Sequence, residues 1–407
     1  MIFASMTSDV KWFLSFRFFT TVAMQMKMTI LSYFLYKISG EAIALGMLGL
    51  YEALPRIALA LPAGYQVERM EKKKALGIVI GSYFILALLL FLAMHYFQSK
   101  PTILTQVIYL GVFVIGVIGS MSMGASVALF SAIIPKDRMA QYSAMSSNAW
   151  QIGAIVGPIL GGYLIKFSGS ENAFLMVVFF LFIALLSILK LPKVESQLQN
   201  DLSIRDSVQK MKEGLLYVRD NKVMLWAISL DLFAVLFGGC VALLPIFAKD
   251  ILLVDSDGYG HLRAAMPFGA AITMLYLARN PIRKDTGRWL LIFVGLFGLA
   301  TLCFALSRSF YLSLFILFLM GAFDAVSVVI RGAILMLETP DHMRARVSSV
   351  NSIFISSSNE IGTFESGFAA QILGTVRSVL FGGSMTLLFV GIAWSKAKVL
   401  KNYSMKG

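Results

Sequence analysis

The chain of 407 residues is 58% hydrophobic and only 14% charged, whereas soluble domains average about 45–50% apolar and about 25% charged residues. This composition, with a mean hydropathy of +0.79, leaves a water-soluble fold too little interior for its apolar side chains and predicts an all-α integral membrane protein. The formal net charge of +13 suggests nucleic-acid binding only if the basic residues gather on one surface, and their distribution, described below, excludes this.

A helix that crosses the hydrocarbon core needs about 20 mostly apolar residues, and twelve such windows follow one another along the chain. The first six predicted spans are residues 13–36, 42–66, 76–97, 102–133, 140–165 and 172–191. The last six are residues 223–248, 258–279, 289–307, 310–336, 346–372 and 378–395. These runs are too long and too continuous for the strands of a membrane barrel. We therefore expect twelve transmembrane helices.

One long polar stretch, residues 192–222, separates the sixth span from the seventh. It predicts an N-terminal six-helix bundle over 1–191, a cytoplasmic linker over 192–222, and a C-terminal six-helix bundle with a short cytoplasmic tail over 223–407. Within the linker, apolar residues recur at helical spacing over 204–218, which predicts an amphipathic helix along the membrane surface.

The basic residues are distributed unevenly between the two sides of the membrane. With the N-terminus inside, the inner loops and tails hold 24 of the 35 lysines and arginines, and the outer loops hold seven. This asymmetry follows the positive-inside bias of membrane proteins. It predicts a multi-pass protein of a bacterial inner (cytoplasmic) membrane with both termini cytoplasmic, and the lipid bilayer rather than nucleic acid as its partner.

The two six-span halves repeat the same residues at offsets of 205 to 212. Gly46 and Pro55 in the second span correspond to Gly258 and Pro267 in the eighth. Matches in the same order join spans four and five to spans ten and eleven: Pro135 with Pro340, Ala140 with Ala345, Ser143 with Ser348, Ser147 with Ser352, Gly157 with Gly362, and Gly162 with Gly367. Internal duplication of six-span halves, with a substrate site near mid-membrane, is a transporter architecture.

With this duplication, the chain resembles the major facilitator superfamily over essentially its whole length, and two motifs carry the resemblance. The first is "GYQVERMEKKKAL", residues 64–76, between spans two and three. The residues that match the superfamily hairpin are Gly64, Arg69, Lys72, Lys73 and Leu76.

The same hairpin departs from the superfamily pattern at two positions. Glu68 stands where an aspartate is usual, and Glu71 stands where a second glycine is usual. The resemblance implies that Glu68 holds the cytoplasmic side closed through the positive N-terminal end of helix eleven and through Arg344 or Arg346. A solvated loop that only follows the charge bias is the alternative.

The second motif is "GAIVGPILGG" in span five, which matches a signature associated with exporters in this superfamily. Its members are Gly153, Gly157, Pro158, Gly161 and Gly162. Three of the glycines recur every four residues and line one helix face, which lets another backbone come close. The proline adds a kink whose freed carbonyl needs another partner. The resemblance implies that this face packs against span eight and seals the path, and a generic packing face is the alternative.

In the second half, "SLDLFAVLFGGCVALLPIFAKDIL" and "SNEIGTFESG" resemble the exporter branch that includes enterobactin (siderophore) exporters and drug:proton antiporters. The resemblance implies outward transport of an amphipathic organic cargo. Because no P-loop is present, the proton gradient is the expected energy source, and no cofactor is expected. The three histidines predict no metal site, and neither an HExxH nor a GxSxG signature indicates an enzyme.

A charged side chain inside a span needs a reason, because its insertion at the bilayer centre costs at least about 2.5–3.5 kcal/mol. Glu52 and Arg56 lie one turn apart in span two and predict a salt bridge, which is either structural or a switch. Lys27 in the middle of span one has no opposite charge at i±3 or i±4. We expect it to face a cavity or to meet an acid from another helix, with a role in substrate binding or coupling.

Spans seven, ten and eleven carry further charges. Asp324 and Arg331 share one face of span ten but lie roughly 10 Å apart by helix rise, too far for direct pairing. Many relatives carry an arginine on span four for proton traffic, whereas "GVIGSMSMGASVALF" has none, which makes Arg331 a candidate substitute. A desolvated acid with a raised pKa can carry a proton. The candidates are Glu360, Asp324 and Glu52, ranked above Asp231 and Glu365, and a structural hydrogen bond is the alternative for each.

Together these features predict a twelve-helix secondary transporter that works as a monomer. It exports a siderophore or drug-like compound by proton antiport, alternating between inward- and outward-open states. Proton-coupled uptake of a small organic solute is the alternative within the transporter class. A non-transporting sensor with the same fold is the alternative outside it, and the buried ionisable groups argue against that alternative.

Overall fold

A computed structural model of the chain describes residues 6–194 and 204–405, and these residues form helices joined by turns, with no β-strand among them. They divide into two compact units, Met1–Ser39 with Tyr51–Ile204 and Gly40–Leu50 with Arg205–Gly407. The first unit holds α1 (Ser8–Ser39), α3 (Ala60–Arg69), α4 (Lys72–Tyr96), α5 (Pro101–Ile133) and α6 (Met139–Leu189). The second holds α7 (Ile204–Asp220), α8 (Lys222–Phe237), α9 (Leu244–Ile246), α10 (Ser256–Arg279), α11 (Thr286–Leu306), α12 (Phe310–Glu338), α13 (Arg344–Leu373), α14 (Thr375–Lys396) and α15 (Lys398–Lys401). Helix α2 (Ala42–Ala58) belongs partly to each unit.

Within the described residues, seven helices are long and apolar enough to cross a membrane, or eight if the bent pair α2 and α3 counts as one span. The chain is therefore a multi-pass membrane protein. Helix α6 contains two predicted spans, which meet at Gly169, where a φ of 79° interrupts the helix. Helices α1, α10 and α13 coincide with three more predicted spans but carry more polar residues than the others. The count of twelve spans stays a prediction.

Two spans that the sequence predicts as continuous are broken. Helices α2 and α3 are bent by 60° relative to each other. Helix α8 ends at Phe237, and 3₁₀ and π turns follow before residue 252. A Cβ on Gly238 would lie 2.7 Å from the ring of Phe297, and one on Gly239 would lie 2.6 Å from Ser366 Oγ. The predicted span over 223–248 is present as one apolar span, Lys222–Ile251, but its α-helix is interrupted where the backbone passes close to α11 and α13.

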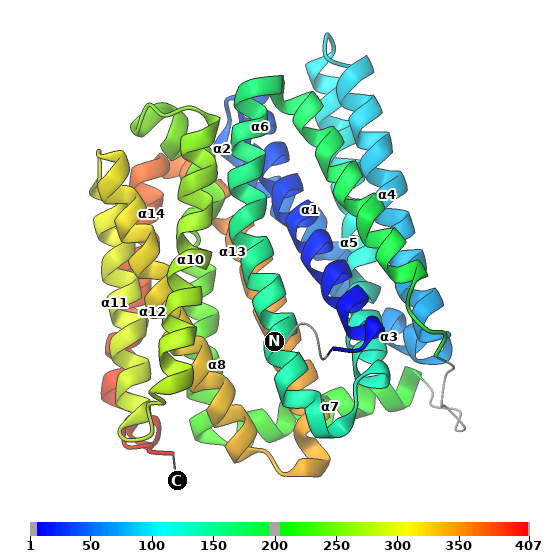
Figure 1. The fold of residues 1–407 in the computed structure, drawn as a ribbon. Coiled ribbons are helices and arrows are strands. Elements are labelled where there is room, and N and C mark those ends of the chain that lie inside the picture. The colour runs from blue at the N-terminus through cyan, green and yellow to red at the C-terminus, as the bar shows by residue number, and fades with distance from the viewer. Residues whose placement is uncertain (1–5, 195–203, 406–407) are drawn as a thin grey trace. The chain divides into compact units, whose positions relative to one another are not determined.

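Helix α1 runs beside the first part of α6 in the first unit (Figure 1). The glycine face of "GAIVGPILGG" makes this contact: a Cβ on Gly157 would lie 2.8 Å from the carbonyl oxygen of Val22, and one on Gly153 would lie 2.9 Å from Thr21 Cβ. Gly161 faces Met26 in the same way. The predicted close approach is confirmed, and α1 is the helix that makes it. The predicted packing against residues 258–279 stays a prediction.

Glycines also bring backbones together in the second unit. A Cβ on Gly269 of α10 would collide with a carbonyl oxygen of α12, and a Cβ on Gly321 of α12 would collide with one of α10. The start of α2 packs against α13 in the same unit, where a Cβ on Gly367 would lie 2.6 Å from the Cα atom of Gly46. Helix α7 covers the range of the predicted amphipathic helix. Its Gly214 lies against the backbone at the start of α13.

We expect Gly157→Ala to destabilise the protein, because the added methyl group meets the backbone of α1 and forces a shift. Overpacking of this kind typically costs about 1–3 kcal/mol. Gly81→Ala in α4 is the matched control, since its Cβ has no neighbour within 4 Å and alanine favours a helix over glycine. Thermal unfolding of the purified variants in detergent checks this. Equal melting temperatures for the two variants contradict the close packing of α1 on α6.

Candidate functional site

Among the described residues, the buried ion pairs form one cluster in each unit, and the first cluster is centred on Glu52 of α2. Lys27 Nζ on α1 lies 3.3 Å from Glu52 Oε2, and Arg56 Nη2 lies 2.5 Å from Glu52 Oε1. The side chain of Lys27 is 5% exposed and that of Glu52 is 13% exposed. The predicted Glu52–Arg56 salt bridge is therefore present, and Lys27 meets an acid from another helix, as expected. The three side chains together carry one more positive than negative charge.

Helix α5, the predicted fourth span, supports this cluster with glycines in the segment that has no arginine of its own. A Cβ on Gly116 would lie 2.6 Å from Pro55 Cγ, and one on Gly119 would lie 2.9 Å from Arg56 Nε and 3.2 Å from the hydroxyl of Tyr83. The guanidinium group of Arg56 thus lies directly on α5. Arg331 is the substitute that the sequence suggests for the cation missing from span four, but α2 brings Arg56 to that helix. The two glycines, three residues apart on α5, were the sequence signal that could have indicated this close approach of α2.

The second cluster lies in the second unit and is built on an ion pair between Asp231 of α8 and Arg331 of α12. Their side chains are 9% and 4% exposed, so the pair is buried. Asp324 lies on the same face of α12 but pairs with neither partner, as its distance along the helix from Arg331 predicts. No described residue forms a hydrogen bond or ion pair with the Asp324 carboxylate.

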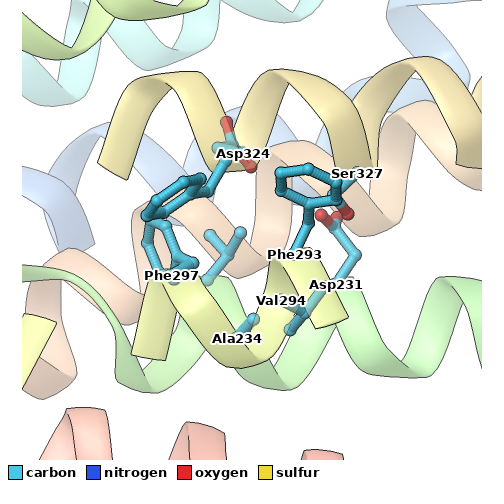
Figure 2. Close-up of a pocket in the computed structure, with 9 residues that line it drawn as sticks. Asp231, Ala234, Phe293, Val294, Phe297, Asp324 and Ser327 are labelled. Carbon is cyan, nitrogen blue, oxygen red and sulfur yellow. The ribbon is translucent and has the colours of Figure 1, made fainter. Parts of the chain in front are cut away.

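A small pocket joins the two carboxylates of this cluster (Figure 2). Its remaining lining residues are Ala234, Val235, Phe293, Val294, Phe297, Phe323 and Ser327. In Figure 2, the ring of Phe293 lies between Asp324 and Asp231, and the Asp231 carboxylate points toward Ser327. The pocket has room for about one water molecule. The sequence analysis found its acids but not its phenylalanines, because aromatic residues at helical spacing are common in every span of this chain.

The other two predicted acids, Glu360 and Glu365, lie on α13 and do not line this pocket. The backbone carbonyl of Glu360 lies close to Gly49 of α2, where a Cβ would come within 3.0 Å of it. Glu365 is half-buried one turn further along the helix. The backbone of Glu360 therefore belongs to the contact between α13 and the start of α2.

Residues of the hairpin motif connect the start of α4 to the end of α6 through hydrogen bonds. Lys73 Nζ donates hydrogen bonds to the carbonyl oxygens of Leu189 at 3.0 Å and Leu191 at 2.5 Å. A cation at this place stabilises the C-terminal end of a helix. Lys72 donates to the carbonyl oxygen of Glu68 at 2.8 Å, and the guanidinium group of Arg69 lies 4.6 Å from the ring centroid of Tyr65. Gly64 has open space around its Cα atom.

The two arginines expected to meet Glu68 have partners within their own unit, and their predicted contact with Glu68 stays a prediction. Arg344 pairs with Asp341 at 2.8 Å, and Arg346 pairs with Glu213 of the linker helix α7. The sequence analysis missed Glu213 because it treated the linker as a surface segment. The close approach of Gly214 to the carbonyl group of Arg346 brings the carboxylate within reach.

Comparison with known proteins identifies the kind of protein to which these clusters belong. A family model described as Major Facilitator Superfamily matches residues 13–363. The chain is 24% identical over 331 residues to the enterobactin exporter EntS of Shigella flexneri and to that of Escherichia coli O1:K1 / APEC, over 81% of this chain and 77% of each relative.

Solved structures with the same fold include two transporters. One is a POT family transporter in complex with 5-aminolevulinic acid, with a TM-score of 0.75, 12% identity and 96% of both chains covered. The other is a bacterial homologue of the human lysosomal transporter Spinster in an inward-facing and unoccupied conformation. Its TM-score is 0.73 at 13% identity, over 98% of this chain and all of that one. These relatives and neighbours are transporters and not enzymes.

We expect Asp231→Asn to destabilise the protein strongly, because it leaves Arg331 buried without its carboxylate. Removing one partner of a buried ion pair costs about 3–5 kcal/mol. The double variant D231N/R331M removes both charges and is expected to regain most of the loss. Asp220→Asn is the control, because its pair with Arg219 is exposed and such pairs contribute about 0–1 kcal/mol. Thermal unfolding decides, and a D231N variant as stable as D220N counts against the pair.

Proposed function

Because the chain belongs to the Major Facilitator Superfamily, we propose that it exports a small amphipathic organic molecule by proton antiport with alternating access. Membership of the family makes the chain a transporter, and the direction, the driving ion and the cargo are the parts we propose. We place it in a bacterial inner membrane with both termini in the cytoplasm, as its distribution of basic residues favours. We expect it to work as a monomer.

Two observations support export rather than uptake. The curated relatives at 24% identity are enterobactin exporters, and their likeness extends over most of this chain. The glycine motif associated with exporters is complete in the sequence, and its glycines lie against the backbone of α1. A backbone contact of this closeness leaves no space for solvent or cargo between α1 and α6. The cargo we infer is a siderophore or another drug-like compound.

The observation that carries the proton coupling is the unpaired carboxylate of Asp324. It lies in a pocket walled by phenylalanine rings, whereas the neighbouring Asp231 has its charge balanced by Arg331. An uncompensated charge in an apolar pocket is costly, and a carboxyl group removes this cost by binding a proton. Asp324 is therefore the acid in this unit that is best suited to bind and release a proton during transport.

The coupling follows from a difference in proton affinity between two states. If Asp324 binds a proton more strongly in the outward-open state than in the inward-open state, a proton taken up outside is released inside, and the return step carries cargo outward. A ligand shifts such an equilibrium only by its differential affinity for the two states. The phenylalanine pocket provides this difference if the opening of one side admits water to the carboxylate.

We expect Asp324→Asn to abolish proton-driven export while leaving the folded protein as stable as the wild type or more stable, because the substitution removes an unpaired buried charge. The assay follows iron-free enterobactin and ethidium in proteoliposomes with an imposed pH gradient, with and without a protonophore. Export predicts transport that collapses when the protonophore is added. Uptake predicts transport in the opposite direction relative to the gradient.

The matched control is Asp220→Asn, which removes an exposed carboxylate from the linker helix and is expected to transport normally. A second variant, Glu360→Gln, tests the other acid that the sequence ranked highly. If E360Q loses coupling and D324N keeps it, the assignment of the proton to Asp324 is wrong although export stands. If no gradient-dependent transport occurs with either probe, the proposed antiport is contradicted for these compounds.

A further inference from the structure

Helix α1 carries a stripe of polar residues that the charge pairs described above do not explain. The polar residues Arg17, Thr20 and Lys27, with the apolar Met24 between the last two, follow one another at spacings of three and four residues and therefore lie on one side of the helix. We call this set the α1 stripe. Its upper end, toward the C-terminus of α1, is Lys27, which belongs to the Glu52 cluster. Its lower end is Arg17, roughly 15 Å from Lys27 along the helix axis.

The lower half of the α1 stripe contains polar groups without partners. The Nε atom of Arg17 and the hydroxyl oxygen of Thr20 are buried, and neither has a hydrogen-bond partner among the described residues. No described carboxylate pairs with Arg17. A polar group buried without a hydrogen-bond partner destabilises the folded protein, and a charged group does so more strongly than a neutral one. Two such groups, one turn apart on the same side of a helix, indicate that a ligand supplies their missing hydrogen-bond partners.

The charge balance of the first unit favours a negatively charged ligand. Lys27 of the stripe and Arg56 of α2 both pair with Glu52, so these three side chains together carry one more positive than negative charge. Arg17 adds a second. Both unpartnered groups at the lower part can donate hydrogen bonds, since a guanidinium has no acceptor and a hydroxyl group rotates to donate. Arginine and hydroxyl donors one turn apart on the same side of a helix suit a carboxylate, phosphate or catecholate oxygen.

We propose that Arg17 and Thr20 bind an anionic group of the transported molecule, and that the net positive Glu52 cluster further along the α1 stripe attracts it. This inference rests on the proposed function and narrows its cargo to amphipathic organic anions. Glu52 holds Lys27 and Arg56 in place as their counter-ion and does not contact the cargo anion. The anionic headgroup of a membrane lipid has the same chemistry, and the experiment separates it from a cargo.

The test is binding to the purified full-length protein in a neutral detergent, measured by thermal shift with two matched pairs of probes. The pairs are 1-naphthoate with 1-naphthamide and 4-biphenylcarboxylate with its amide, which differ only in the charge. We expect the acids to stabilise the wild type at lower concentrations than the amides. Arg17→Gln is expected to weaken acid binding roughly tenfold or more, and Thr20→Val a few-fold, as hydrogen bonds to a charged group imply.

Three controls make the result specific. Lys37→Gln removes an exposed cation from the same helix and is expected to keep the acid preference, and Arg17→Lys is expected to regain part of it. Folding of R17Q is expected to be intact, since no ion pair is lost. Dioleoylphosphatidylglycerol, added alone, tests the lipid headgroup.

The proposal is overturned if the amides stabilise the wild type as well as the acids, if R17Q keeps the acid preference, or if only the lipid stabilises the protein. None of these measurements uses a pH gradient. Failure of proton-driven export therefore leaves this result standing, and failure of the acid preference leaves export standing.

Discussion

Glu52 holds two cations in the interior of the first unit, and the position of α2 beside α1 and α5 depends on this contact. Its carboxylate lies 3.3 Å from Lys27 and 2.5 Å from Arg56, in surroundings where charge–charge interactions are stronger than in water. Glycines on α5 let α2 approach closely enough for Arg56 to reach that helix. A buried carboxylate with two basic partners leaves these three side chains with one more positive than negative charge.

The sequence predicted which side chains and helix faces take part in this arrangement better than it predicted which residues they contact. It located Lys27 as a charge that needs an acid, and it placed Glu52 and Arg56 one turn apart, because helical spacing is visible in one dimension. It also found the glycine face of "GAIVGPILGG". The predicted neighbour of this face was span eight, whereas α1 lies against it. A face of small residues indicates that another helix comes close, but it does not indicate which helix.

The same distinction explains the other differences between expectation and structure. Arg346 pairs with Glu213 of α7, a partner 133 residues away in a segment whose placement no periodicity reveals. The break after Phe237 depends on rings and backbones of other helices that pass close to Gly238 and Gly239. The unpartnered atoms of Arg17 and Thr20 are likewise a property of packing, since the sequence shows a polar residue but not whether a neighbour satisfies it. For this reason neither residue stands out from the sequence alone.

The charges that remain unpaired differ in sign between the two units. The first unit keeps positive charge on the α1 stripe, and the second keeps the negative charge of Asp324 beside the balanced pair of Asp231 and Arg331. If the cargo anion binds to the first set and the proton to the second, the two ligands do not compete for one group. Antiport then has to come from the conformational equilibrium, with each ligand favouring a different state by its differential affinity. Such coupling is reciprocal, so a bound organic acid lowers the proton affinity of Asp324 by the same factor by which the proton lowers the affinity for the acid.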